Sequence, residues 1–244
     1  KGPLGWIARK SCLDSGLVNQ ARTGHNGRVT ETGGTPAIFP TIPPMSTASP
    51  IGFGLQDYVR SIEQVLDKRP ANKIIIREVS KATKELCSDD RWLEERYRIG
   101  ESDRYTRHLL HKDPKNRFII LSLVWQPGQI TPIHDHACWG VMGIVDNTLE
   151  EICYDRLDDG SRPDFCELEQ SRGTDVGKGG VAYLLPPFEE IHRIGNTSNK
   201  PTISLHVYGR DLDEINVFDQ ATGKVSAMRI KYYSPDIGDE PFVI

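Results

Sequence analysis

The chain has 244 residues, of which 37% are hydrophobic, so it has enough apolar material for one large domain or two small ones. Its 30 basic and 34 acidic residues give a net charge of −4, which excludes the basic field of a nucleic-acid-binding protein and a polybasic membrane patch. No run approaches the roughly 18 apolar residues of a membrane helix, and five cysteines without C-x-x-C spacing favour a reduced, cytoplasmic setting.

The first 50 residues differ in composition from the rest of the chain. They are rich in glycine, proline, threonine and serine and show little periodicity, which predicts a disordered or loosely attached arm over residues 1–50. Met45 is followed by Ser-Thr-Ala-Ser-Pro, which reads as an ordinary start, so residues 1–44 are expected to be an upstream extension or an artificially added segment. A single domain is expected over residues 51–244.

Helical patterns come next, within residues 55–100. Residues 55–67 carry apolar side chains on one amphipathic stripe, and residues 72–87 continue with near-helical apolar spacing. Ser88-Asp89-Asp90 is typical of a cap for a short third helix that contains Trp92 and Leu93. Two or three helices are therefore expected before the next change of pattern.

From Arg104 onward the pattern changes to short strands that are separated by turns rich in glycine, proline, aspartate and asparagine. Many short strands at regular intervals favour a sandwich or barrel over residues 104–235. The expected strands are 105–110, 118–125, 139–145, 149–154, 181–185, 191–195, 202–208, 215–219 and 227–233.

The segment His134-Asp135-His136 carries the strongest chemical signal in the chain. On a β-strand, residues i and i+2 point to the same face, so two imidazoles there are placed to bind one metal ion. His192 and His206 follow in strand-like sequence, which suggests a mononuclear metal site inside a β-barrel. A lone His-x-His pair is also compatible with two surface or hydrogen-bonded histidines.

The neighbourhood of these histidines has a recognisable spacing, which consists of Gly128, His134-x-His136, Pro187, His192 and Asn196. It resembles the two signature motifs of the cupin superfamily, which implies a jelly-roll β-barrel with inward metal ligands. The glutamate that this motif usually carries four or five residues after its second histidine is replaced by Gly140 and Val141. The resemblance therefore implies a site of three neutral histidines that holds a divalent first-row metal with open positions.

Four segments sharpen the resemblance to one family. They are Arg104-Tyr-Thr-Arg-His-Leu-Leu, the Pro127 to His136 run with Trp139-Gly140, Glu190-Ile-His-Arg-Ile, and Ser204-Leu-His-Val-Tyr-Gly209. Over roughly residues 55–235 the chain resembles the cysteine-dioxygenase-like thiol dioxygenases, which oxidise a thiol with O₂ to a sulfinic acid. The resemblance implies iron(II) bound by His134, His136 and His192.

The same resemblance implies roles for the other polar residues of these segments. Arg107, next to Tyr105 in the Tyr-Thr-Arg segment, would bind the substrate carboxylate with its planar fork, although an average arginine forms a surface salt bridge. Ser204, His206 and Tyr208 alternate along one strand, so they face the same way and are placed to form a relay that ends at the tyrosine hydroxyl. A strand that merely buries satisfied polar groups would look the same.

Two departures from the family pattern bear on the substrate. Eukaryotic members carry a cysteine five residues after the second ligand, crosslinked to the tyrosine; Val141 stands there, so no crosslink is expected. Trp139-Gly140 instead resembles the bacterial 3-mercaptopropionate dioxygenase branch. Members of that branch often have arginines about nine residues after the tyrosine, but here the place holds Val217. The carboxylate anchor is therefore open between Arg107 and Arg210.

The sequence thus predicts a mainly β protein, a cupin barrel preceded by two or three helices, that acts as an iron(II) thiol dioxygenase on a small carboxylated thiol. The favoured substrate is 3-mercaptopropionate, with cysteine next and mercaptosuccinate open. The alternatives are a non-catalytic cupin that binds a small ligand and a cupin enzyme that uses another divalent metal. Its partners are expected to be the thiol and O₂, without nucleic acid or membrane, in a cytoplasmic monomer or small homo-oligomer.

Overall fold

The computed structural model describes residues 52–187 and 189–230, all of which belong to one unit, residues 49–244. The arm predicted over residues 1–50, with its extension over 1–44, lies outside the described residues, as do residues 231–233 of the last predicted strand. The expected domain boundary at residue 51 therefore stays a prediction.

Two α-helices open the described chain, α1 (Leu55–Asp67) and α2 (Asn72–Leu86), as the apolar spacing predicted. The backbone N–H of Gly54 donates to the Asp57 carboxylate at 3.1 Å, which satisfies one exposed donor at the start of α1. The predicted third helix is wrong in detail: Trp92 and Leu93 lie in a turn, and a short 3₁₀-helix, η1 (Glu95–Arg98), follows. Among the described residues, no helix has the length and apolar character needed to cross a membrane.

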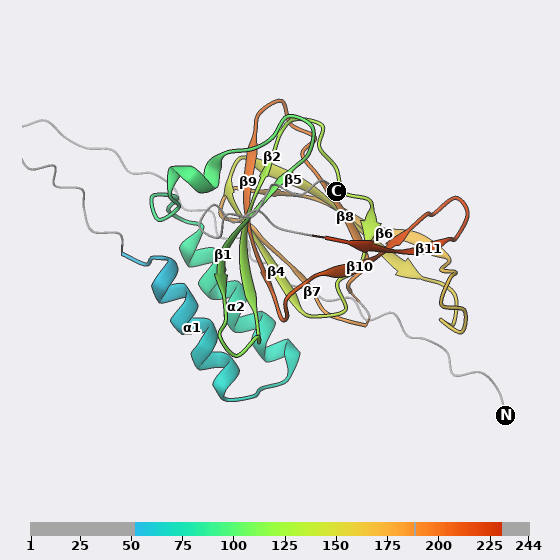
Figure 1. Ribbon diagram of the computed structural model, residues 1–244, viewed down its shortest axis with the longest axis horizontal. Helices are drawn as coiled ribbons and strands as arrows, with labels where there is room; N and C mark the ends of the chain where they lie inside the picture. Colours follow the sequence, from blue (N-terminus) through green and yellow to red (C-terminus); the bar gives the residue numbers. More distant parts are fainter. Residues whose placement is uncertain (1–51, 188, 231–244) are drawn as a thin grey trace, which may run out of the picture. The chain divides into compact units, whose positions relative to one another are not determined.

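Two antiparallel sheets follow, so the mainly β prediction is confirmed (Figure 1). One sheet has the strand order β1-β2-β9-β4-β7, and the other has the order β11-β10-β3-β8-β5-β6. The strands are β1 (Thr106–Lys112), β2 (Ile119–Trp125), β3 (Ile133–His134), β4 (Gly140–Asp146), β5 (Thr148–Arg156), β6 (Leu168–Gly177), β7 (Val181–Leu184), β8 (His192–Gly195), β9 (Thr202–Tyr208), β10 (Glu214–Phe218) and β11 (Val225–Arg229).

One of these strands was missed in the sequence, and a second is shorter than the strand suggested around His134 and His136. The edge strand β6 is mostly exposed and polar, so it lacks the apolar alternation that marks a half-buried strand. Strand β3 has only two residues and pairs with β10 and β8 through the residues around His134. A pairing this short leaves no periodic pattern in the sequence.

Strand β9 is buried along its whole length, and its two faces lie in different surroundings, one under the helices and one between the sheets. Ile203, Leu205 and Val207 pack in the cluster that also contains the buried faces of α1 and α2. The alternating residues Ser204, His206 and Tyr208 point the other way, between the sheets. The period of two along a strand therefore separates the structural core from the polar interior.

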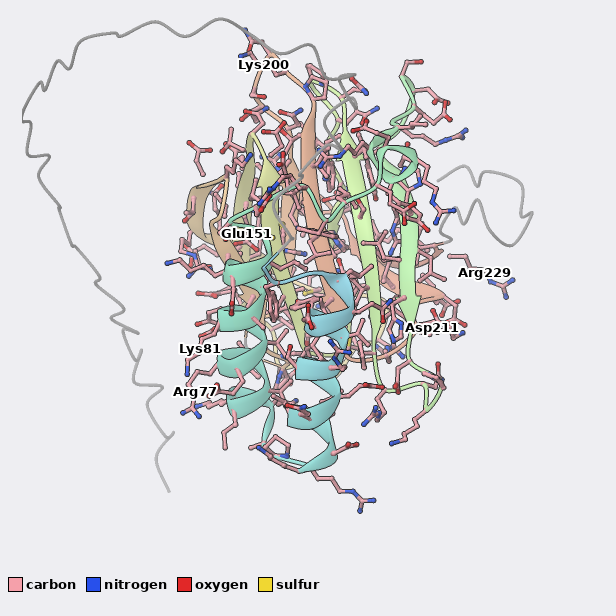
Figure 2. All side chains as sticks on the ribbon, turned by 90° about the vertical axis from the view of Figure 1, so that its left-hand side faces the viewer. Arg77, Lys81, Glu151, Lys200, Asp211 and Arg229 are labelled. Carbon is pink, nitrogen blue, oxygen red and sulfur yellow. The ribbon has the colours of Figure 1, made fainter. Side chains whose placement is uncertain are left out.

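The two helices lie side by side and cover the outer face of the sheet that contains β4 and β9 (Figure 1). Their apolar stripes contribute Tyr58, Ile62 and Val79 to the shared core. Arg77 and Lys81 point away from the sheet on the opposite side of α2 (Figure 2), with exposed side chains. The inner face of the sheet is thus left for the second sheet and the polar residues between them.

Gly143 on β4 lies where α2 packs against the sheet. A β-carbon at that position would lie 2.5 Å from Thr83 Cγ2 and 2.7 Å from Cys87 Sγ, both on or next to α2. We expect Gly143→Ala to push α2 off the sheet and to lower the free energy of unfolding by about 1–3 kcal/mol, as overpacking does in other cores. Urea denaturation measures this loss.

The matched control is Gly177→Ala, because a β-carbon at Gly177 meets no atom within 4 Å. Equal unfolding free energies for the two variants would contradict the proposed packing constraint.

Candidate active site

Three buried histidines from two strands and one loop meet between the sheets. His134 ends β3, His136 follows it in the loop, and His192 begins β8 directly opposite His134 in the antiparallel register. One ring nitrogen of each lies within 4.8 Å of the corresponding nitrogens of the other two, and the three residues are only 3–6% exposed. Among the described residues, this is the only such cluster of potential metal ligands.

The loop after His134 differs from the continuous strand that the sequence suggested. Strand β3 ends at His134, and Ala137 adopts a positive φ of 49° while its N–H donates to the Glu190 carboxylate at 3.1 Å. Asp135 points away from the cluster and accepts hydrogen bonds from the backbone N–H and side-chain amide of Asn216 at 3.1 and 3.0 Å. The two contacts hold the turn that brings His136 back to the cluster.

The hydrogen bonds of the rings leave nitrogen lone pairs for a metal ion. His134 Nδ1 lies 2.9 Å from the Pro132 carbonyl oxygen, and His192 Nδ1 lies 3.0 Å from Glu151 Oε1. Both oxygens only accept, so each Nδ1 carries the proton and each Nε2 has a lone pair. His192 Nε2 and His136 Nδ1 are buried and have no hydrogen-bond partner among the described residues. Such orphaned nitrogens fit a metal ion better than a closed polar core.

Burial keeps the rings of His134 and His136 neutral. Loss of solvation, with the neighbouring His192 as the next cause, lowers the pKa of His134 to about 3, and burial likewise holds the pKa of His136 well below its usual value. A ring with a lowered pKa is unprotonated above that pKa, so both are neutral at pH 7. Metal ligands must be deprotonated, so the site is prepared for a cation.

A chain of hydrogen bonds runs along β9 beside the cluster. Ser204 Oγ lies 2.9 Å from His206 Nε2, and His206 Nδ1 lies 2.9 Å from Tyr208 Oη. Trp125 Nε1 on the neighbouring strand β2 donates to Ser204 Oγ at 2.9 Å. The ring of Tyr208 stacks on His136 with centroids 4.7 Å apart, so the chain ends at the histidine cluster. The three β9 residues thus lie where the sequence predicted.

The indole N–H of Trp125 fixes which group donates and which accepts at each hydrogen bond from Ser204 to Tyr208. An indole N–H only donates, so Ser204 Oγ must accept from Trp125, and its own hydroxyl proton is free to donate to His206 Nε2. His206 then carries its proton on Nδ1 and donates to Tyr208 Oη, which leaves the tyrosine O–H as a donor toward the site. The reverse direction would leave the Ser204 proton without an acceptor among its described contacts.

One cavity is lined by His134 together with His206 and Tyr208. Of the two candidate arginines, Arg107 lines this cavity and Arg210 does not. The cavity is lined by Arg107 and Tyr105 of the segment around β1, together with Leu123, Trp125, Thr131, His134, Ile194, His206, Tyr208, Ile215 and Ile230. Arg107 is 7% exposed. Burial raises the pKa of Tyr208 and of Tyr105, and the positive charge of Arg107 opposes part of that rise. Tyr105 stacks on Trp125 with a 4.4 Å centroid separation.

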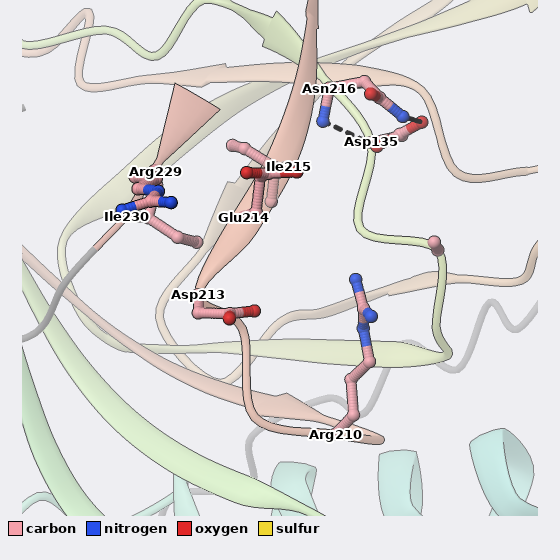
Figure 3. A pocket seen from close by; sticks show the side chains of 9 residues that line it. Asp135, Arg210, Asp213, Glu214, Ile215, Asn216, Arg229 and Ile230 are labelled. Atoms are coloured by element: carbon pink, nitrogen blue, oxygen red, sulfur yellow. Dashed lines mark hydrogen bonds between the residues drawn. The ribbon is translucent and has the colours of Figure 1, made fainter. Parts of the chain in front are cut away.

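Arg210 lies elsewhere, in an outer hollow of about 580 Å³ that also contains Asp135, Asp213 and Arg229 (Figure 3). Arg210 Nη2 lies 3.4 Å from the His136 carbonyl oxygen. Ile215 and Ile230 line both this outer hollow and the inner cavity. The structure therefore brings Arg107 together with the histidines and leaves Arg210 outside.

The residue that faces the tyrosine ring is Gly140, and not Val141 as residue counting suggested. Gly140 pairs with Tyr208 across β4 and β9, and a β-carbon there would lie 3.2 Å from Tyr208 Cδ1. Val141 alternates to the other face and packs in the cluster under the helices. Neither residue has a thiol, so the absence of a crosslink at these positions stays the expectation.

Two site residues escaped the sequence reading. Trp125 lay at the end of a predicted strand, and its hydrogen bond to Ser204 depends on a pairing of β2 with β9 that the sequence does not show. Glu151 lay within a predicted strand, but its contact with His192 was not foreseen. Its position two residues after buried Leu149 places a carboxylate on an inward face, and this was the available signal.

The direction of the relay is testable through the protonated nitrogen of His206. In ¹⁵N NMR spectra of the protein labelled at histidine rings, we expect His206 to carry its proton on Nδ1. Trp125→Phe removes the donor to Ser204 and should populate both tautomers. Trp92→Phe is the matched control, because that indole donates to the Leu86 carbonyl. A wild-type His206 protonated on Nε2 would contradict the direction.

Comparison with known proteins supplies the family. The family model described as "Cysteine dioxygenase type I" matches residues 45–221. Cysteine dioxygenase type 1 of Danio rerio is 24% identical over 189 residues, which cover 74% of this chain and 86% of that protein.

Two solved structures are also similar. One is an uncharacterized conserved protein with a double-stranded β-helix domain from Klebsiella pneumoniae subsp. pneumoniae MGH 78578, with a TM-score of 0.36 and 15% identity over 58% of this chain and 98% of that chain. The other is a Cupin 2 conserved barrel domain protein from Salinispora arenicola CNS-205, with a TM-score of 0.34 and 18% identity over 48% of this chain and 84% of that chain. Because the family model matches more than half of the sequence, the chain belongs to the cysteine dioxygenase type I family.

Proposed function

We propose that the protein is an iron(II)-dependent dioxygenase that oxidises a small carboxylated thiol to its sulfinic acid. Both atoms of O₂ enter the product, so the reaction RSH + O₂ → RSO₂H balances without an external reductant. The observation that carries the proposal is the cluster of three buried histidines, one of which, His134, lines a cavity together with Arg107 and Tyr208.

The proposed metal ligands are His134, His136 and His192. Three imidazoles suit several first-row divalent metals, and the resemblance of the sequence to the thiol dioxygenases supports iron among them. A bound iron(II) ion would supply Lewis acidity for the thiol and redox chemistry for dioxygen. Because the three ligand rings carry no charge of their own, a bound divalent ion would attract an anionic substrate at its open positions.

The proposed carboxylate anchor is Arg107. Its guanidinium lines the same cavity as His134 and Tyr208, whereas Arg210 lines the outer hollow. A buried guanidinium binds a carboxylate through two parallel charge-assisted hydrogen bonds, which are stronger in a cavity that excludes water. Tyr105, stacked on Trp125, forms the adjoining wall and restricts where the carboxylate lies.

The lining of the cavity favours 3-mercaptopropionate over cysteine. Among the described residues, no aspartate or glutamate lines the cavity that contains Arg107, so nothing there pairs with the ammonium group of cysteine. Arg107 is also the only lysine or arginine among these lining residues, so a second carboxylate, as in mercaptosuccinate, has no matching cation. A monocarboxylate thiol matches the single buried positive charge.

Tyr208 is proposed to donate a hydrogen bond or a proton to oxygen of the reacting group. Its hydroxyl accepts from His206 Nδ1–H, so its own proton points toward the cavity. Burial raises its pKa, which keeps the phenol protonated at neutral pH. His206 and Ser204 position this donor and are not proposed to bind the metal. The cytoplasmic location and the monomeric or small homo-oligomeric state stay predictions.

The deciding experiment loads the purified chain with Fe(II) without oxygen, removes unbound iron, and then follows O₂ uptake and sulfinate formation with three thiols. We expect one iron per chain, equal amounts of O₂ consumed and sulfinate formed, and the highest kcat/KM for 3-mercaptopropionate. Tight thiol binding without O₂ uptake would support a non-catalytic cupin instead. Exclusive retention of zinc, nickel or manganese would support an enzyme of another reaction class.

The choice between the two arginines gives a separate prediction. Arg107→Ala should raise KM for 3-mercaptopropionate about 10- to 100-fold, because a hydrogen-bonded charged pair contributes about 1.5–3 kcal/mol. Arg210→Ala is the matched control and should leave KM within about threefold. Iron content measured on both variants separates loss of binding from loss of metal. A larger effect at Arg210 would move the anchor to the outer hollow.

A further inference from the structure

Glu151 is a buried carboxylate behind one of the proposed metal ligands. It projects from β5 and is 3% exposed, and its Oε1 lies 3.0 Å from His192 Nδ1 on β8. The adjacent residue Glu150 faces the other side of the strand, where its carboxylate lies 3.5 Å from Arg193 Nη2 and both side chains are about one-third exposed. Two successive glutamates therefore stand in opposite environments.

The charge of Arg172 acts on Glu151 from a distance, but the Arg172 guanidinium donates to Cys153 Sγ and forms no ion pair with the Glu151 carboxylate. Within the described part of the chain, no lysine or arginine lies within ion-pair distance of its carboxylate, and its only ion-pair partner is His192. An isolated carboxylate is expensive to bury, and a neutral imidazole N–H offsets only part of that cost. A cation on the far side of the His192 ring would provide the missing compensation, since His192 Nε2 is buried without a partner.

We propose that Glu151 is the positioning residue of the metal site, where it fixes the orientation of His192 and supplies the negative charge that strengthens metal binding. This inference rests on the proposed three-histidine metal site and is independent of which thiol is the substrate. Carboxylate–histidine–metal arrangements of this kind raise the basicity of the ligand and fix its tautomer. The contact does so here across the pairing of β5 with β8.

The carboxylate and the metal should stabilise each other. A metal ion held by His192 through its unpartnered Nε2 would make the Nδ1–H a stronger donor to Glu151, and the carboxylate would in turn make Nε2 a better ligand. Glu151→Gln keeps an acceptor oxygen of the same reach but removes the charge. Its effect should therefore fall mainly on the metal-loaded protein, whereas a merely structural role would destabilise the metal-free and metal-loaded forms alike.

The test measures Fe(II) affinity without oxygen, by competition with a chelator of known affinity, and the unfolding temperature with and without Fe(II). We expect Glu151→Gln to weaken Fe(II) binding about 10- to 100-fold, the usual effect of losing such a partner. The rise in unfolding temperature on adding iron should shrink accordingly, because that rise depends on affinity. The unfolding temperature of the metal-free protein should change little.

Glu150→Gln is the matched control and should bind Fe(II) like wild type. Glu151→Asp keeps the negative charge but has a side chain one methylene shorter, so the carboxylate lies farther from His192. We expect its Fe(II) affinity to lie between those of wild type and Glu151→Gln. The proposal is overturned if Glu151→Gln binds Fe(II) within about twofold of Glu150→Gln, or if a folded Glu151→Asp matches wild type. Failure of wild type itself to bind Fe(II) would instead refute the proposed metal site.

Discussion

The alternation of side chains along β9 is the constraint on which the rest of the molecule depends. One set of residues on this strand joins the apolar core under the helices, and the other set forms the hydrogen-bonded chain from Ser204 to Tyr208. A shift of one residue in the register with β2 or β4 would exchange these sets, burying the polar chain against the helices. Fold stability and site geometry are therefore specified by the same pairing.

Much of this arrangement could be predicted from the sequence, for a physical reason. The bounds of α1 and the extent of β9 follow from local periodicity, and His134 and His136 follow from their two-residue spacing. Features that depend on pairing between distant strands were not predictable in this way. The contacts of Trp125 and Glu151 arise from registers with β9 and β8, and no pattern within either strand encodes its partner.

Errors of the sequence reading have the same origin. The residue facing Tyr208 was predicted by counting five residues from His136, which gives Val141. The chain is not a continuous strand there, because a loop around Ala137 separates His136 from β4, and the register of β4 with β9 places Gly140 against the tyrosine. The edge strand β6 was missed because it has solvent on most of its side chains. Local pattern identifies a strand through burial, and an edge strand offers too little burial to be identified.

Gly140 has a consequence for how Tyr208 is held. A residue with no side chain stands against one edge of the ring, and the nearest ring stacked on it is His136, itself a proposed ligand. The phenol is thus oriented by a hydrogen bond and a stacking contact, both of which are reversible and directional, while the β4 residue that pairs with it has no side chain to confine it. The Tyr208 ring should become more mobile when its hydrogen bond to His206 or its stacking on His136 weakens. The rigidity of this tyrosine therefore depends on the positions of the neighbouring histidines and on whether His136 binds a metal ion.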